Sequence, residues 1–180
     1  MILAKEQGMY INLSEIFSGS RPVLEQDIFP EKEFYESSFG SFRILSQEPM
    51  HLKIESSGKD KAKISGRIHM VFETRCDRCL TQTETTVDSG FEREVVSPNV
   101  SDAEEELRDC MDAYSLDTEA LMQDEISVNW PVKILCREDC KGLCPVCGQN
   151  LNEGTCGCDT FVPDPRMAAL KDIFESSKEV

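Results

Sequence analysis

The chain has 180 residues, an ordinary apolar fraction of 39% and a formal net charge of −15 at pH 7. No apolar stretch approaches the roughly 20 residues of a membrane-spanning helix, so we expect a soluble protein with no membrane partner. The negative charge disfavours broad contact with a nucleic-acid duplex, because such contact requires lysine and arginine side chains that neutralise phosphates. Basic proteins are more natural partners.

The first 41 residues show only a weak pattern. We expect a short strand over residues 9–13 and a helical turn over residues 13–17, ended by the Ser18–Pro22 segment. Five aromatic residues follow among glutamates, and we expect them to form a partly buried group with no chemistry of its own: Phe29, Phe34, Tyr35, Phe39 and Phe42.

Apolar and polar residues alternate with period two from Met50 onward. Two alternating runs, residues 50–54 and 64–72, are separated by a turn at residues 57–60. This pattern predicts an antiparallel β-hairpin with one apolar face. His51 and His69 fall on the polar side of their strands, and we interpret them as surface residues and not as metal ligands.

A third strand is expected over residues 83–95. The second strand of the hairpin then ends near Cys76, and Cys76-Asp77-Arg78-Cys79 occupies the turn that leads into the third strand. The sequence therefore predicts two thiols at a hairpin tip, where a metal ion can connect the sheet to another segment.

Two thirds of the net charge lies in residues 92–125, which contain twelve acidic side chains and two arginines, a net charge of −10. Residues 99–116 have too few apolar side chains for a packed shape, and we expect an acidic linker there, either a solvated loop or an attractant for a basic partner. Basic residues cluster near the hairpin and form either a direct contact to RNA or a solvated strand face: Arg43, Lys53, Lys59, Lys61, Lys63, Arg67, Arg75 and Arg78.

Asp117 and Thr118 predict the start of a helix, because either can cap the first turn and acidic residues follow. The end of this helix is ambiguous, since residues 126–134 also alternate with period two, but Pro131 ends any helix before it. Farther on, Asp164-Pro165 and an apolar stripe at helical spacing predict an amphipathic C-terminal helix.

Six of the nine cysteines lie between Cys136 and Cys158. A zinc ion binds four thiolates at about 2.3 Å in a tetrahedron, and the spacing Cys144-x2-Cys147 lets one turn direct two sulfurs at one ion. Cys156 and Cys158 can complete this set of four. The spacing is therefore typical of a structural metal site.

The remaining cysteines allow a second site. Cys76 and Cys79 can combine with Cys136 and Cys140, or they can join the C-x2-C pair of the C-terminal group as a zinc ribbon, and spacing alone leaves both pairings open. We expect Cys110 to belong to no site, so that its replacement by serine changes neither zinc content nor melting temperature. The prediction is one or two structural zinc ions held by eight candidate ligands: Cys76, Cys79, Cys136, Cys140, Cys144, Cys147, Cys156 and Cys158.

Disulfides are the competing interpretation of these cysteines. Residues 1–6 are charged early and lack the apolar run of a signal peptide, so we expect the reducing cytoplasm, where metal thiolates are favoured over disulfides. A C-x2-C redox pair is expected at a helix start within a βαβ pattern, which the sequence around Cys76 does not show.

The run CREDCKGLCPVCGQNLN from Cys136 to Asn152 carries a resemblance to a known family. Together with Cys76-Asp77-Arg78-Cys79-Leu80, Cys156-x-Cys158 and Asp164-Pro165-Arg166, it resembles the YceD family of large ribosomal RNA subunit accumulation proteins. The resemblance extends from about Met9 to the C-terminal helix. It implies a bacterial or organellar factor needed for normal levels of large-subunit ribosomal RNA, and conveys no molecular mechanism.

These observations predict an α+β protein with an antiparallel β-sheet domain over residues 1–98, the acidic linker over 99–116, and a helix, zinc module and C-terminal helix over 117–180. We favour a non-enzymatic ribosome-biogenesis factor that binds a basic ribosomal protein or a large-subunit assembly intermediate. An RNA-processing nuclease or hydrolase is less favoured, because catalytic zinc keeps an open position and usually has histidine or carboxylate ligands. A redox sensor that releases zinc on thiol oxidation would use the same cysteines.

Overall fold

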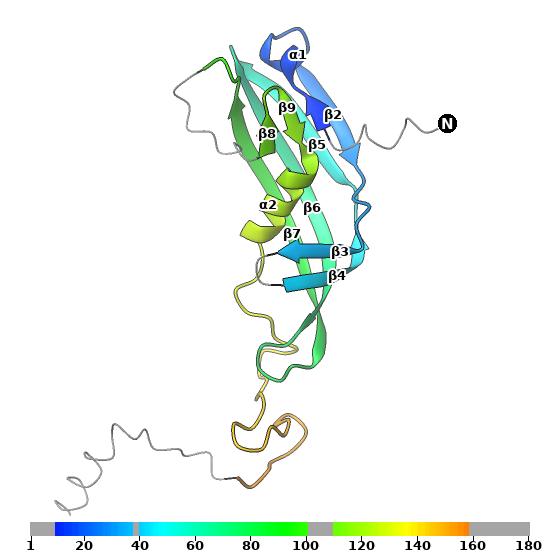
Figure 1. Ribbon diagram of the computed structural model, residues 1–180, viewed down its shortest axis with the longest axis vertical. Helices are drawn as coiled ribbons and strands as arrows, with labels where there is room; N and C mark the ends of the chain where they lie inside the picture. Colours follow the sequence, from blue (N-terminus) through cyan, green and yellow to red (C-terminus); the bar gives the residue numbers. More distant parts are fainter. Residues whose placement is uncertain (1–9, 38–39, 101–109, 159–180) are drawn as a thin grey trace, which may run out of the picture.

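One long β-hairpin runs through the computed structural model, which describes residues 10–37, 40–100 and 110–158. Its strands β6 (Lys61–Arg75) and β7 (Gln82–Val96) pair antiparallel over their whole length. The molecule is elongated, and the turn between these strands points toward the cysteine-rich segment at one end (Figure 1). The hairpin thus connects the body of the fold with that segment.

The large sheet has six strands and is antiparallel throughout. Strand β7 lies along one side of β6, and the other side pairs with two strands in succession, β5 with its first half and β4 with its second half. Strands β2 and β3 extend the sheet from β5 and β4. These four strands span Val23–Ile28 (β2), Phe34–Ser37 (β3), Gly40–Gln47 (β4) and Met50–Gly58 (β5).

A smaller layer covers one face of this sheet. It contains a three-stranded sheet in the order β1-β9-β8 together with helices α1 and α2, with α1 packed on β5 and β6 and α2 packed on β6 and β7 (Figure 1). The elements are β1 (Tyr10–Asn12), α1 (Ser14–Phe17), β8 (Met111–Asp112), β9 (Ser115–Asp117) and α2 (Thr118–Val128).

The core lies between these two layers. Alternate residues of β5, β6 and β7 point into it, as the period of two requires, and they meet apolar side chains of α1, β9 and α2. Its fully buried side chains include Leu13, Ile16, Leu52, Ile54, Ile64, Ile68, Phe72, Leu116, Leu121 and Ile126.

The opposite face of the sheet is polar, and its basic residues have acidic neighbours. Lys63 Nζ lies 2.8 Å from Glu92 Oε1, and Arg67 forms two hydrogen bonds of 2.9 Å with Asp88. Lys61 and Lys53 approach Glu94 and Glu55 within 3.7 and 2.7 Å. Four of the eight residues of the predicted basic cluster therefore lie beside carboxylates, three of which are on β7.

The structure confirms the predicted α+β class with its antiparallel hairpin, its third strand and the C-x2-C turn between β6 and β7. Helix α2 begins where expected, because Asp117 Oδ1 accepts hydrogen bonds from Glu119 N and Ala120 N at 2.9 and 3.0 Å. It ends at Val128, ahead of Pro131. Among the described residues no helix has the length and apolar character needed to cross a membrane.

Several expectations differ from the structure. The linker expected over residues 99–116 contains β8 and most of β9 at its C-terminal end, because these strands pair with one another and with β1. Helix α2 shares the core of the large sheet instead of belonging with the cysteine-rich segment. Strands β2, β3 and β4 had no recognisable sequence signal. The expected C-terminal helix and residues 101–109 lie outside the described residues.

The aromatic group expected between residues 29 and 42 is divided in the structure. Tyr35 is buried in the core, whereas Phe29 is exposed over 67% of its surface and Phe34 over 48%, so neither of these two is the partly buried residue we expected. Phe42 is half-buried and packs against the core. Phe39 lies outside the described residues.

Candidate metal centres

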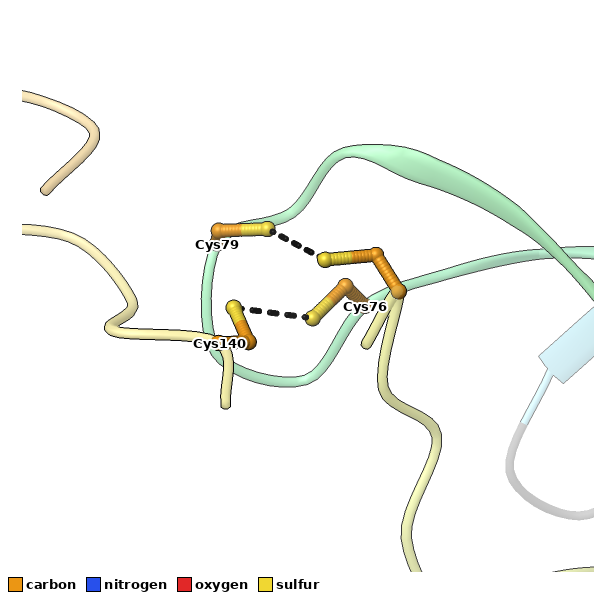
Figure 2. Close-up of side chains that lie close together, drawn as sticks. Cys76, Cys79 and Cys140 are labelled. Carbon is orange, nitrogen blue, oxygen red and sulfur yellow. Dashed lines mark hydrogen bonds between the residues drawn. The ribbon is translucent and has the colours of Figure 1, made fainter. Parts of the chain in front are cut away.

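The first candidate centre, which we call centre 1, joins two segments far apart in the sequence. Cys76 and Cys79 come from the turn between β6 and β7, and Cys136 and Cys140 come from the loop that follows α2. The turn is closed by two hydrogen bonds of 2.9 Å, from Leu80 N to Cys76 O and from Cys76 N to Thr81 O. Figure 2 shows Cys140 approaching the pair Cys76 and Cys79 from the opposite segment.

The two residues between Cys76 and Cys79 hold the opposite segment in place. Asp77 forms a two-way contact with Ile134, accepting from Ile134 N at 2.7 Å through Oδ2 and donating its own N–H to Ile134 O at 2.8 Å. Arg78 Nη1 donates to Cys140 O at 2.7 Å. The sequence analysis gave Asp77 no role and placed Arg78 in the basic cluster, and it did not predict that either residue holds the segment of Cys136 and Cys140.

The distances between the sulfurs of centre 1 fit a tetrahedral metal ion. Cys76 Sγ lies 3.7 Å from Cys140 Sγ, and Cys79 Sγ lies 3.6 Å from Cys136 Sγ. All four sulfurs lie within 4.8 Å of one another. A tetrahedron with metal–sulfur bonds of 2.3 Å has sulfur–sulfur edges of about 3.8 Å, whereas a disulfide bond is about 2.05 Å long. The observed spacing is that of four ligands around one ion.

The second candidate centre, centre 2, is formed within residues 144–158 and contains Cys144, Cys147, Cys156 and Cys158, whose sulfurs also lie within 4.8 Å of one another. Its first turn is closed by hydrogen bonds from Gly148 N to Cys144 O at 2.9 Å and from Cys144 N to Gln149 O at 2.8 Å. Gly148 has a φ of +74°, which a residue with a side chain rarely adopts. This glycine explains the tight return of the chain after the second thiol.

One thiol in each centre has a strongly lowered pKa. Burial opposes ionisation of Cys76, but backbone hydrogen bonds to its sulfur, the strongest involving Cys136, outweigh burial and lower its pKa to about 6. The pKa of Cys144 also falls to about 6, chiefly because of a backbone hydrogen bond from Cys147. Both residues are the first cysteine of a C-x2-C turn, where backbone N–H groups point at the sulfur and favour the thiolate.

A different thiol in each centre has a raised pKa. Desolvation of the sulfur, in a residue that is exposed as a whole, and then a hydrogen bond with Cys79 raise the pKa of Cys136 to about 12. Hydrogen bonds with neighbouring thiols, first Cys147, raise the pKa of Cys158 to about 12. Thiolates gathered this closely repel one another, and a divalent cation between them removes that repulsion. The donor set therefore fits a thiophilic metal ion at each centre.

The structure brings the eight predicted cysteines together as two sets of four. Cys76 and Cys79 face Cys136 and Cys140, and not the C-x2-C pair Cys144 and Cys147 with which a zinc ribbon would have joined them. Cys110 lies in the main hydrophobic core. Exposed His51 pairs with Asp27, and His69 Nδ1 lies 3.6 Å from Asp88. Both histidines thus contact carboxylates on the polar face of the sheet.

The two centres are in direct contact through the chain between them. Leu143 N donates to Arg78 O at 3.2 Å, and Leu151 N donates to Gly142 O at 2.9 Å. A Cβ atom at Gly142 would lie 3.1 Å from Arg78 O, and its φ of +78° also favours glycine. The turn of centre 1 and the loop of centre 2 therefore form one continuous hydrogen-bonded unit.

Comparison with known proteins identifies the family. The family model described as "Large ribosomal RNA subunit accumulation protein YceD" matches residues 64–174, which include most of the β6–β7 hairpin and all eight cysteines of the two centres. The chain belongs to the YceD family. The family is described by the accumulation of large-subunit ribosomal RNA.

Two curated proteins are similar to this YceD-family chain. A chloroplastic protein of Arabidopsis thaliana, "Large ribosomal RNA subunit accumulation protein YCED homolog 1", is 23% identical over 150 residues, covering 67% of this chain and 47% of its own. An uncharacterized protein of Mycobacterium leprae is 27% identical over 106 residues, covering 57% of this chain and 48% of its own. The chain thus spans about half the length of the curated relatives it matches. No solved structure matches it.

Proposed function

We propose that this chain is a non-enzymatic ribosome-biogenesis factor of the cytoplasm that supports accumulation of large-subunit ribosomal RNA, with a structural zinc ion in each centre. The observation that carries the zinc proposal is that each set consists of four cysteines whose sulfurs lie within 4.8 Å of one another, with two pairs in centre 1 at 3.6 and 3.7 Å. Structural zinc is closed by four protein ligands, whereas catalytic zinc keeps one position for water or substrate.

Metal content tests this proposal directly. We expect full-length protein purified without added metal to contain two equivalents of zinc by elemental analysis. Cys136 and Cys147 are the exposed ligands of centre 1 and centre 2, so Cys136→Ser and Cys147→Ser disturb packing least while leaving three thiolates. Each variant should lose one equivalent of zinc.

Two outcomes would contradict the zinc proposal. Wild-type protein that is folded and free of metal would show that the thiols pack without an ion. Protein that contains iron instead would assign the four-sulfur sites to iron, which shares this ligand geometry.

We further propose that the partner is a basic ribosomal protein, or an assembly intermediate that presents one. The net charge of −15 supports this choice. So does the polar face of the sheet, because Lys61, Lys63 and Arg67 already have carboxylate neighbours and would have to exchange them to bind phosphates. The attraction should weaken as added salt shortens the Debye length from about 10 Å at 0.1 M.

Affinity capture from growing cells, with bound protein and RNA both identified, distinguishes the partners. Glutamine at Glu104, Glu105 and Glu106, which lie outside the described residues, should weaken capture of a basic protein. The matched triple of glutamines at Lys59, Lys61 and Lys63 should not. Loss of association only in the lysine triple would instead assign the hairpin to direct RNA contact, and cleavage of precursor RNA by the purified chain would establish the enzyme hypothesis.

A further inference from the structure

Asn152 belongs to the loop of centre 2 but contacts a sulfur of centre 1. It follows Cys147 and precedes Cys156 in the sequence, yet its Nδ2 donates a hydrogen bond of 3.3 Å to Cys140 Sγ. Cys140 is 2% exposed, so this contact is made on the inner side of centre 1. The amide thus connects the two candidate metal centres.

The neighbours of Asn152 fix which end of its amide faces the sulfur. Its Oδ1 accepts two hydrogen bonds of 2.8 Å, from Lys141 N and from Arg137 Nη2. A backbone N–H and a guanidinium can only donate, so the oxygen must face them. The amide NH2 is consequently the end that faces Cys140.

The position of this amide depends on the fold of its own loop. The second hydrogen of Asn152 Nδ2 is donated to Asn150 Oδ1 at 2.8 Å, and Asn152 N donates to the same oxygen at 3.1 Å. Asn150 in turn forms a β-bridge with Leu143, on the other side of the first turn of centre 2. Cysteines of centre 2 precede and follow Asn152, so closing that centre orders the residue.

We propose that Asn152 is a positioning residue for centre 1 that makes metal binding at the two centres mutually dependent. When centre 2 is closed, the amide N–H stabilises the negative charge on Cys140 Sγ and fixes its direction. Partners of this kind around a metal site typically change metal affinity by about 10-fold to 100-fold. Because coupling between two binding events is reciprocal, filling centre 1 strengthens centre 2 by the same factor. The inference rests on the proposed metal sites.

The variant Asn152→Asp removes the amide donor. Aspartate has the shape of asparagine and keeps an oxygen for Lys141 and Arg137, but it has no N–H for Cys140 Sγ or for Asn150 Oδ1. The matched control is Gln149→Glu, which makes the same amide-to-carboxylate change at an exposed position of the same loop. The difference between the two variants therefore reports the loss of the Asn152 amide N–H groups and not the general effect of one added negative charge in the loop.

The experiment loads full-length protein with ¹¹³Cd²⁺ and follows each centre by ¹¹³Cd NMR during competition with a chelator. The resonance missing from Cys136→Ser belongs to centre 1, and the one missing from Cys147→Ser belongs to centre 2. We expect Asn152→Asp to shift the resonance of centre 1 and lower its affinity by about 10-fold or more, while Gln149→Glu leaves both unchanged.

A double-mutant cycle tests the coupling itself. Cys147→Ser, which opens centre 2, should weaken centre 1 as much as Asn152→Asp does, and the two changes together should weaken it no further. The inference would be overturned if the losses of centre 1 affinity in the two single variants multiplied in the double variant. It would also be overturned if Asn152→Asp, like Gln149→Glu, left the resonance and the affinity of centre 1 unchanged. Wild-type protein that binds fewer than two ions would instead overturn the proposed metal sites, so the two failures are distinguishable.

Discussion

Single polar contacts determine how the cysteine-rich end is held. The loop carrying Cys136 and Cys140 is positioned largely by two hydrogen bonds, one accepted by Asp77 Oδ2 from Ile134 N and one donated by Arg78 Nη1 to Cys140 O. The apolar cluster there contains little besides Leu135, Leu143 and the cysteines. A side chain that holds the backbone of the other segment therefore affects how well four sulfurs are preorganised for a metal ion. The residues between the thiols matter as well as the thiols.

We expect Asp77→Ala to weaken metal binding at centre 1 by about 1 kcal/mol. Ile134 N loses its carboxylate acceptor, and a single hydrogen bond typically contributes about this much. Asp77→Asn is the matched control, since it removes the same charge but keeps an oxygen that can accept from Ile134 N. Chelator competition on both variants gives the comparison. Equal weakening in the two would show that charge and not the hydrogen bond matters.

Cys110 packs in the core, so we no longer expect its replacement by serine to leave the melting temperature unchanged. It is only 4% exposed and belongs to the main core. We still expect Cys110→Ser to leave the zinc content at two equivalents. The melting temperature should fall, because burying a hydroxyl in place of a thiol costs about 1–3 kcal/mol. Elemental analysis and thermal unfolding of the same sample measure both effects, and a lost equivalent of zinc would place Cys110 among the ligands.

At the scale of elements, strands β6 and β7 and the side chain of Trp130 connect the large sheet to the metal centres. Strands β6 and β7 contribute to the core along their length and end in the turn of centre 1. After α2 ends, Trp130 packs against Tyr35, Phe42 and Phe72, with ring centroids 4.7–5.7 Å apart. This contact fixes the segment that leads to Cys136, so both halves of centre 1 are anchored on the same sheet.

The packing of the hairpin can be tested at Gly66 of β6, which pairs with Phe91 of β7. A Cβ atom at Gly66 of β6 would lie 2.7 Å from the Phe91 ring of β7, whereas one at Gly90 would meet only Gly66 O, at 3.8 Å. We expect Gly66→Ala to lower the free energy of unfolding by about 1–3 kcal/mol because the ring must move. Gly90→Ala in the paired strand should be neutral or stabilising. Urea unfolding compares the two, and equal stability would mean that the core adapts to the added methyl group.

At the scale of the whole molecule, the two ends are stabilised differently. The sheet end has a continuous core made by β5, β6, β7, α1 and α2, whereas the cysteine-rich end has a separate small cluster. Where a metal site replaces a core, its binding free energy is also folding free energy. The two ends should therefore respond differently to metal removal.

We expect a strong chelator to unfold residues 136–158 while the large sheet, with Trp130 packed against its core, stays folded. Hydrogen exchange should become fast in residues 136–158 and remain slow in the middle of β6 and β7. Re-addition of zinc should restore protection, which serves as the control for irreversible oxidation. Loss of protection throughout the sheet would show that the metal centres and the core unfold as one unit.

Local features of this protein followed from the sequence alone. Alternation with period two predicted β5, β6 and β7, because a half-buried strand exposes every second side chain to water. The capping oxygen of Asp117 predicted the start of α2. Two C-x2-C pairs, together with the close spacing of the other four cysteines, identified the eight candidate ligands. Each of these signals involves residues a few positions apart, whose geometry the backbone itself limits.

The tertiary structure decided what depends on residues distant in sequence. Strands β2, β3 and β4 form because neighbouring strands complete their hydrogen bonds, so their own residues need no strong pattern. The pairing of Cys76 and Cys79 with Cys136 and Cys140 is set by where the hairpin tip meets the segment after α2, a distance that spacing does not encode. For the same reason Asn152, a residue of centre 2, could be placed on a sulfur of centre 1 only once both loops were folded.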